Sequence, residues 1–170
     1  MNEVKPITLW WVLPAVLAGM PMPFIRRDRR MDRGSGLSTY DDDLPILRLA
    51  GIRAVVSLLD NSEDDWIFDA TGFAFHCVPV AEGGAPTMEQ ALGVVRFVNR
   101  QRAGHRPVAV HCEAGIGRTG TVLAACLISQ GDGVESAIAR VRSVRQSAIE
   151  TPAQIEFLKQ FARWPSLSGV

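Results

Sequence analysis

Short apolar runs alternate along this chain with longer stretches in which apolar residues recur at helical spacing. The apolar runs predict buried strands at 10–13, 16–19, 53–59, 73–80 and 107–110. The stretches with helical spacing predict helices at 43–50, 87–103, 121–128, 134–144 and 151–161. Strands separated by helices indicate an α/β fold. We expect a single three-layer domain, with a mostly parallel central sheet of about five strands flanked by helices.

Three segments fall outside this alternation. Residues 1–8 predict a loose N-terminal segment, and residues 60–69 predict an acidic, polar connection. Residues 26–43 carry five arginines followed by three consecutive aspartates. We interpret 26–43 as a charged, solvated insertion whose aspartates lie near the N-terminus of the next helix. The alternative is that its arginines flank the functional site and attract an acidic substrate.

The uncharged stretch 9–25 resembles the beginning of a signal or membrane segment. It is short for a membrane span, and Pro14, Pro21 and Pro23 interrupt it. Two short buried strands around a turn at Pro14 account for the same pattern. We therefore expect no association with a membrane.

The composition sets limits on partners and compartment. With 170 residues, 47% of them hydrophobic, the chain suits one domain with a full core. Its 18 basic residues balance 18 acidic ones, so no overall field draws it to nucleic acid or to an anionic membrane. Cys77, Cys112 and Cys126 form no Cys-x-x-Cys pair, which favours free thiols in a reducing compartment. We expect a cytoplasmic monomer that binds no nucleic acid.

The segment from His111 to Gly120, HCEAGIGRTG, connects the last predicted strand to a helix. A loop that opens a helix directs its unpaired backbone N–H groups, and the positive end of the helix dipole, at one point. Glycines let such a loop curl into an anion-binding nest. Cys112, beside this nest and beside Arg118, should be held as the nucleophilic thiolate. Phosphate fits the same cradle, and the expected phosphate-binding residues are Glu113, Ala114, Gly115, Ile116, Gly117 and Arg118.

The Cys-x5-Arg spacing of Cys112 and Arg118, followed by Thr119-Gly120, resembles the signature of the protein tyrosine phosphatases. Further segments resemble the small atypical dual-specificity phosphatases at fitting positions, namely 11–14, 17–19, 56–58 and 147–154. The resemblance implies a phosphotyrosine phosphatase-like fold. It also implies a phosphoric monoester hydrolase that needs neither a metal nor a cofactor.

The same resemblance implies a reaction in two steps. The Cys112 thiolate forms a cysteinyl-phosphate while Arg118 grips the phosphate oxygens, and water then hydrolyses this intermediate. Thr119 would hydrogen-bond the sulfur as it leaves, and His111 would orient the loop. The alternative interpretation is that Thr119 only begins a helix and His111 is only a buried core residue.

The leaving oxygen needs a proton from a carboxylic acid on a neighbouring loop. The family places an aspartate after the strand that precedes the helix before the motif, whereas the matching loop of this chain offers Glu82. Glutamate can perform the same acid chemistry, although its longer side chain changes its reach. Glu150 is the second candidate for the acid. Gln154 is a candidate for positioning the hydrolytic water, and the alternative is an exposed helix residue.

The predicted function is hydrolysis of phosphotyrosine in a phosphorylated protein or peptide, with phosphoserine and phosphothreonine as further substrates. The alternative substrate is a phosphoinositide or an RNA 5′-phosphate. Glu113, Ala114 and Ile116 in the loop argue against a highly anionic substrate, which would favour lysine or arginine there. A different class is a module that binds phospho-ligands without turnover. Glu82 in place of an aspartate favours such a module, and the intact cysteine and arginine oppose it.

Overall fold

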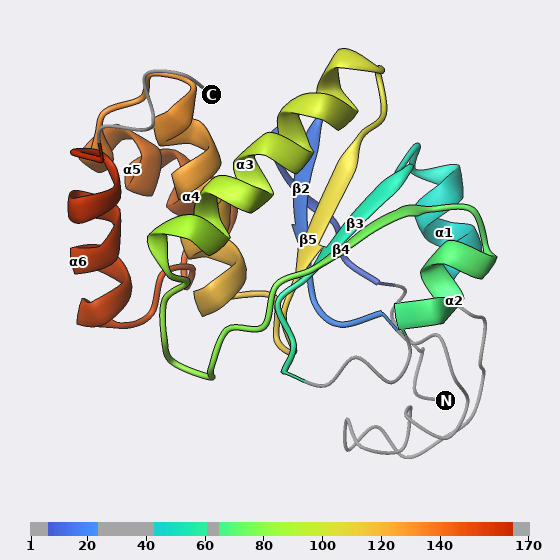
Figure 1. Ribbon diagram of the computed structural model, residues 1–170, viewed down its shortest axis with the longest axis horizontal. Helices are drawn as coiled ribbons and strands as arrows, with labels where there is room; N and C mark the ends of the chain where they lie inside the picture. The colour runs from blue at the N-terminus through green and yellow to red at the C-terminus, as the bar shows by residue number, and fades with distance from the viewer. Residues whose placement is uncertain (1–6, 24–42, 61–64, 165–170) are drawn as a thin grey trace.

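The computed structural model describes residues 7–23, 43–60 and 65–164 (Figure 1). The predictions for residues 1–6 and for most of the charged insertion lie outside the described residues. Ile7, near the end of the segment that we expect to be loose, is buried in an apolar cluster with Met20 and Val55.

Five strands and six helices make up the described part of the chain. The strands are β1 (Trp10–Leu13), β2 (Leu17–Met20), β3 (Ala54–Ser57), β4 (Ala74–Cys77) and β5 (Val108–His111). The helices are α1 (Asp43–Leu49), α2 (Asp65–Ala70), α3 (Met88–Ala103), α4 (Gly117–Ser129), α5 (Val134–Val144) and α6 (Pro152–Phe161). The predicted α/β alternation is therefore confirmed.

The strands form one sheet in the order β1-β2-β5-β3-β4. β1 pairs antiparallel with β2, and the other neighbours are parallel. The pairing places Met20, Ser57 and Cys77 in one row with His111. Because the carboxyl ends of parallel strands meet at one edge, the segments that follow β2, β5, β3 and β4 converge there.

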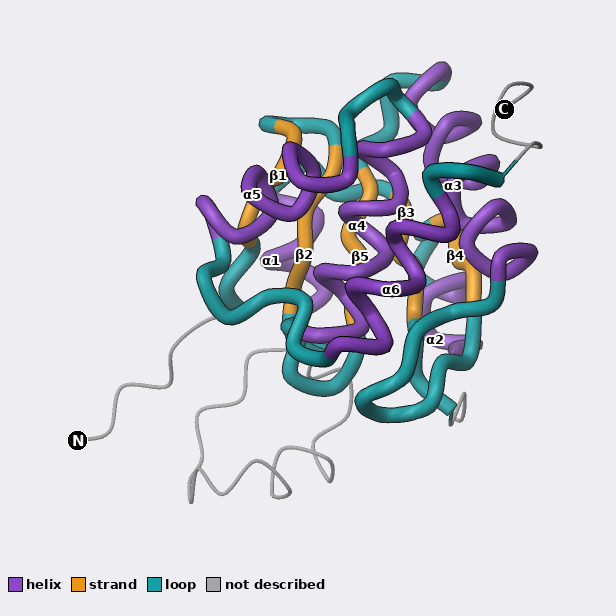
Figure 2. Tube along the Cα trace, turned by 90° about the vertical axis from the view of Figure 1, so that its left-hand side faces the viewer, coloured by secondary structure: helices purple, strands orange, loops and turns teal. Residues whose placement is uncertain are grey.

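Helices cover both faces of this sheet. Helices α1 and α2 lie on one face, and α3, α4, α5 and α6 lie on the other (Figure 1). Figure 2, turned toward α5 and α6, shows the strands behind this thicker layer. Val55 and Ala109 belong to the apolar cluster on the α1 side, whereas Val56 and Val110 belong to the cluster on the α4 side. Successive strand residues thus face opposite layers, which explains their continuous apolar runs.

Helix α4 lies at the centre of the thicker layer. Its residues from Gly117 to Ile128 are all buried, because α3, α5 and α6 pack around it. The helix begins inside the motif, before the predicted apolar run. Arg118 and Thr119 therefore belong to the first turn of a rigid helix.

The stretch after Ile7 forms β1 and β2, and the N–H of Val16 donates to the carbonyl of Leu13 across the turn at 3.0 Å. This agrees with the predicted pair of short strands, although β2 is shifted by one residue. Within the described ranges, no helix combines the length and the apolar character that crossing a membrane requires.

Helix α2 corrects one expectation. The sequence predicts a polar connection over 60–69, whereas residues Asp65–Ala70 form a helix. Phe68 is buried and stacks on Phe75 of β4, with their ring centroids 4.8 Å apart. The packing of Phe68 stabilises this short helix. The sequence does not predict it, because aspartates surround its few apolar residues.

Candidate active site

The motif loop lies at the carboxyl edge of the sheet, between β5 and α4. Cys112 follows β5 directly, and α4 begins at Gly117. Ligands of open α/β sheets bind beyond the carboxyl ends of the strands. The cysteine therefore stands where the fold provides a binding crevice.

Gly115 determines how the loop curls. Its φ of +68° lies in the left-handed region, which favours glycine. A Cβ atom at this position would collide with the main chain of Met20 and Pro21. The N–H of Met22 also donates to the carbonyl of Glu113 at 2.9 Å. The chain that follows β2 thus supports the loop, and only glycine fits against it.

Cys112 is 3% exposed, and two polar neighbours contact it. The Thr119 hydroxyl donates to Cys112 Sγ over 3.2 Å. Nδ1 of buried His111 lies 3.3 Å from the carbonyl oxygen of Cys112. Because a carbonyl can only accept, a hydrogen bond here requires the proton on Nδ1. Thr119 thus acts on the sulfur, and His111 on the backbone of the same residue.

Arg118 is 7% exposed, and the segments that follow β3 and β4 hold its guanidinium group. Nη1 donates to the carbonyl of Val80 at 2.8 Å and to that of Leu58 at 3.5 Å. The Asp60 carboxylate lies 3.9 Å from the same nitrogen, but its side chain is 67% exposed. Exposed ion pairs contribute little. The backbone carbonyls therefore do most to fix Arg118.

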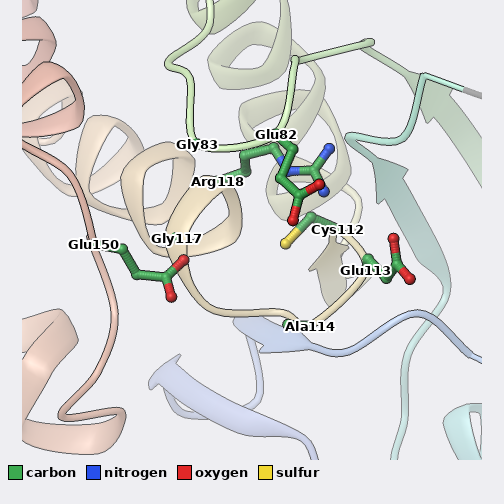
Figure 3. Close-up of a pocket in the computed structure, with 8 residues that line it drawn as sticks. All are labelled: Glu82, Gly83, Cys112, Glu113, Ala114, Gly117, Arg118 and Glu150. Carbon is green, nitrogen blue, oxygen red and sulfur yellow. The ribbon is translucent and has the colours of Figure 1, made fainter. Parts of the chain in front are cut away.

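A cleft of about 240 Å³ opens onto Cys112. Its lining contains seven of the predicted site residues and one further glycine, as Figure 3 shows: Glu82, Gly83, Cys112, Glu113, Ala114, Gly117, Arg118 and Glu150. Among these lining residues Arg118 is the only cation, and three exposed carboxylates surround it. The cleft thus combines one guanidinium group with an acidic rim.

The two candidate acids approach the cleft from opposite sides. Figure 3 shows Glu82 beside Arg118, with its carboxylate toward Cys112, whereas Glu150 reaches toward Gly117 from the other side. A Cβ atom on Gly117 would meet the carboxylate of Glu150. Glycine at the start of α4 therefore permits this close approach.

Gln154 does not line the cleft and is completely buried. Its Oε1 accepts from the N–H groups of Glu150 at 2.8 Å and Thr151 at 3.2 Å. Its Nε2 donates to the carbonyl of Gly84 at 3.0 Å. The interpretation as an exposed helix residue is therefore wrong. The Thr-x-x-Gln capping pattern before the apolar run of α6 is the signal that points to this arrangement.

Two residues at the site carry no role in the sequence interpretation. Asp60, expected to be a solvated loop charge, lies beside Arg118, and Gly83 lines the cleft. Only their position in the sequence points to the site, since each follows a strand that ends at the carboxyl edge.

Burial raises the pKa of Cys126 to about 12, so this free thiol stays protonated and inert. Within the described ranges, no cluster of His, Cys, Asp and Glu side chains could hold a metal ion.

The sequence is similar to a known family model and to several curated proteins. The family model described as "Polymorphic toxin system, DSP-PTPase phosphatase" matches residues 30–132. Human dual specificity protein phosphatase CDC14C is 30% identical over 158 residues, which cover 91% of this chain and 34% of that protein. The uncharacterized protein MJECL20 of Methanocaldococcus jannaschii is 38% identical over 87 residues, or 51% of this chain and 58% of that protein. The chain thus spans less than two thirds of the length of these curated relatives.

A solved structure agrees with this assignment. The crystal structure of Tk-PTP in the active form matches with a TM-score of 0.71 and 28% sequence identity, covering 96% of this chain and 99% of that chain. The family model covers more than half of the chain, and its range includes Cys112 and Arg118. The chain therefore belongs to the polymorphic toxin system DSP-PTPase phosphatase family, within the protein tyrosine and dual-specificity phosphatase superfamily.

Proposed function

We propose that this phosphatase hydrolyses phosphotyrosine, phosphoserine and phosphothreonine in proteins or peptides through a cysteinyl-phosphate on Cys112. The proposal rests mainly on the environment of the Cys112 sulfur. Cys112 is buried yet lines a cleft, Thr119 donates to its sulfur, and Arg118 is fixed beside it. A nucleophile and an oxyanion-binding group thus share one small site.

In the first step, Cys112 Sγ attacks phosphorus, and the bond between phosphorus and the leaving oxygen breaks. A guanidinium group has five N–H donors, so Arg118 can hold the phosphate while its Nη1 stays bound to Val80. The backbone N–H groups at the start of α4 bind the remaining charge. In the second step, water attacks phosphorus and the S–P bond breaks. The hydrogen bond from Thr119 stabilises the sulfur that leaves.

Glu82 is the proton donor of this proposal. It lies in the cleft on the side of Arg118, with its carboxylate toward Cys112 (Figure 3). The leaving oxygen takes its proton in the first step, and the attacking water returns a proton in the second. Glu150, which packs over Gly117, is the second candidate. If Glu82→Gln keeps full activity on a substrate with a poor leaving group while Glu150→Gln loses it, the roles are reversed.

The charge of the cleft supports phosphoproteins over polyanionic substrates. Glu82, Glu113 and Glu150 line the cleft with a single arginine. A phosphoinositide or an RNA 5′-phosphate would bring additional phosphates next to these carboxylates. A phosphopeptide brings one phosphate and can carry basic neighbours.

The experiment compares wild type with Cys112→Ser on three substrates: a phosphotyrosine peptide, a phosphothreonine peptide and a phosphoinositide. We expect wild type to turn over the peptides, and the variant to lose at least about a thousandfold in kcat, because the loss of a nucleophile removes the covalent route. Faster turnover of the phosphoinositide would contradict the substrate class. Tight binding without turnover by wild type would instead establish a phospho-ligand binding module.

A further inference from the structure

We propose that Thr151 and Gln154, at the start of α6, are positioning residues that fix the loop carrying Glu82 against the loop carrying Glu150. The proposal rests on the function proposed above, because it concerns how both carboxylates are placed around Cys112. Neither Thr151 nor Gln154 lines the cleft. Both therefore act through the backbone that they hold.

Two side-chain hydrogen bonds cross from α6 to the loop after β4. The Thr151 hydroxyl donates to the carbonyl of Gly83, and Gln154 Nε2 donates to that of Gly84, each at 3.0 Å. These glycines directly follow Glu82, and a glycine backbone has many conformations open to it. Holding both carbonyls therefore restricts where Glu82 can lie.

The same two residues hold the loop that carries Glu150. Gln154 Oε1 accepts from the N–H groups of Glu150 and Thr151, and Thr151 Oγ1 accepts from the N–H of Gln154 at 3.2 Å. This reciprocal arrangement is a capping box. Oε1 of buried Gln154 thus serves the Glu150 loop, and one of the two N–H groups of its Nε2 serves the Glu82 loop.

Arg142 of α5 secures the other side of the Glu150 loop. Its Nε donates to the carbonyl of Ala148 at 3.0 Å, and its Nη2 donates to that of Ile149 at 2.8 Å. Ile149 has a φ of +62°, which a β-branched residue adopts only where its surroundings impose it. The loop is thus held on both sides of Glu150.

The base of the Glu82 loop has a separate support. Thr87 and Gln90 form a second capping box at the start of α3, and Gln90 Nε2 donates to the carbonyl of Pro79 at 2.9 Å. This bond holds the beginning of the loop from its own helix. The part next to Glu82 is held from α6, so Thr151 and Gln154 couple the two carboxylates.

The test compares Thr151→Val, which keeps the shape of the side chain but loses the hydroxyl, with Thr151→Ser, which keeps the hydroxyl. We measure kcat on p-nitrophenyl phosphate, whose leaving group needs little protonation, and on phenyl phosphate, whose leaving group depends on the acid. We expect Thr151→Val and Gln154→Leu to lower the ratio of phenyl to p-nitrophenyl turnover by about 10- to 100-fold. Thr151→Ser, which keeps the hydroxyl, should keep the ratio of the wild type. Gln160→Leu, at an exposed position of the same helix, is the control and should leave it unchanged.

A second measurement shows that the effect acts through the acid. In a Glu82→Gln background, Thr151→Val should lower the ratio no further. Gln154→Glu keeps the acceptor for Glu150 and loses the donor to Gly84, so it gives the same test if melting curves show Thr151→Val to be unfolded. An unchanged ratio, or an equal loss on both substrates, would overturn the proposal. Full activity of Cys112→Ser would instead overturn the function on which it rests.

Discussion

At the scale of single residues, the site depends on conformations and contacts that few side chains permit. Gly115 curls the loop against the main chain of Met20, where no Cβ fits. Thr119 and His111 contact the sulfur and the carbonyl of Cys112. Cys112 is thus held both by its side chain and by its backbone, so we expect a small displacement of the loop to lower the catalytic rate.

Gly115→Ala should lower kcat by about a hundredfold, because the added Cβ displaces the loop from the main chain of Met20. Gly51→Ala is the matched control. Gly51 also has a positive φ, of +88°, but no atom lies within 4 Å of its Cβ position. The left-handed backbone should cost each variant about 1–2 kcal/mol of unfolding free energy, and Gly115→Ala should lose more because of the added clash. Chemical denaturation and steady-state kinetics measure the two effects. Normal activity of Gly115→Ala would show that the tight fit of the loop against Met20 is not needed for catalysis.

Alkylation of the native protein with iodoacetamide near neutral pH should modify Cys112 and spare Cys126. Cys112 lines the cleft, whereas burial raises the pKa of Cys126 to about 12. Mass spectrometry of the digested protein locates the label, and inorganic phosphate should slow the reaction at Cys112. The unfolded protein is the control, since all three thiols then react. Equal labelling of Cys126 in the folded protein would show that its environment is misassigned.

At the scale of elements, the residues of the site lie just after the ends of strands and at the starts of helices. β5 carries Cys112 to the carboxyl edge, and the first turn of α4 carries Arg118 and Thr119. The segments after β3 and β4 hold Arg118, and the start of α6 holds both carboxylate loops. β4 is itself held on α3 by His76, whose ring stacks on Phe97 with 5.2 Å between centroids.

The stacking of β4 on α3 should make stability depend on pH. Burial, and secondly the charge of Arg100, lowers the pKa of His76 below its usual 6.5. Above that pH the imidazole is neutral in both states. As the pH drops below 6.5, the histidine is protonated in the unfolded chain before it is protonated in the folded protein. The free energy of unfolding therefore decreases as the pH decreases, until the pH reaches the lower pKa of the folded state. His76→Phe keeps an aromatic ring and removes this proton.

Urea unfolding at about pH 7.5 and about pH 5.5, on either side of the ordinary histidine pKa, measures the effect. Wild type should lose more unfolding free energy between the two conditions than His76→Phe does. His105→Phe is the control, because His105 is exposed. An equal loss in wild type and His76→Phe would show that His76 does not carry the dependence.

At the scale of the whole molecule, the acidic rim should select among phosphopeptides. Even without the proton donor Glu82, the carboxylates Glu113 and Glu150 outnumber Arg118 in the lining of the cleft. A phosphotyrosine peptide flanked by arginines should show a higher kcat/KM than one flanked by aspartates. We expect about two- to fivefold for each exposed charge pair, decreasing as salt is added. Glu113→Gln should reduce the preference, and a preference for acidic peptides would contradict this assignment.

The sequence predicts the fold and the nucleophile because both signals are local. Apolar runs mark the strands, and Cys112 and Arg118 stand in one short motif at a strand end. The supporting contacts are not local. Gln154 bonds to Gly84, 70 residues away, and Nη1 of Arg118 donates to the carbonyl of Val80. Backbone carbonyls carry no residue-type signal, so their role emerges only when the chain is folded.

Trapping the covalent intermediate tests directly whether Cys112 is the nucleophile. Wild type is mixed with p-nitrophenyl phosphate in the presence of a chelator and quenched with acid within the first turnovers. The peptide that contains Cys112 is then examined by mass spectrometry. Nucleophilic catalysis by Cys112 predicts a phosphoryl group on this residue, absent from Cys112→Ser, which should also release no phosphate. Phosphate release by Cys112→Ser at the wild-type rate would contradict it.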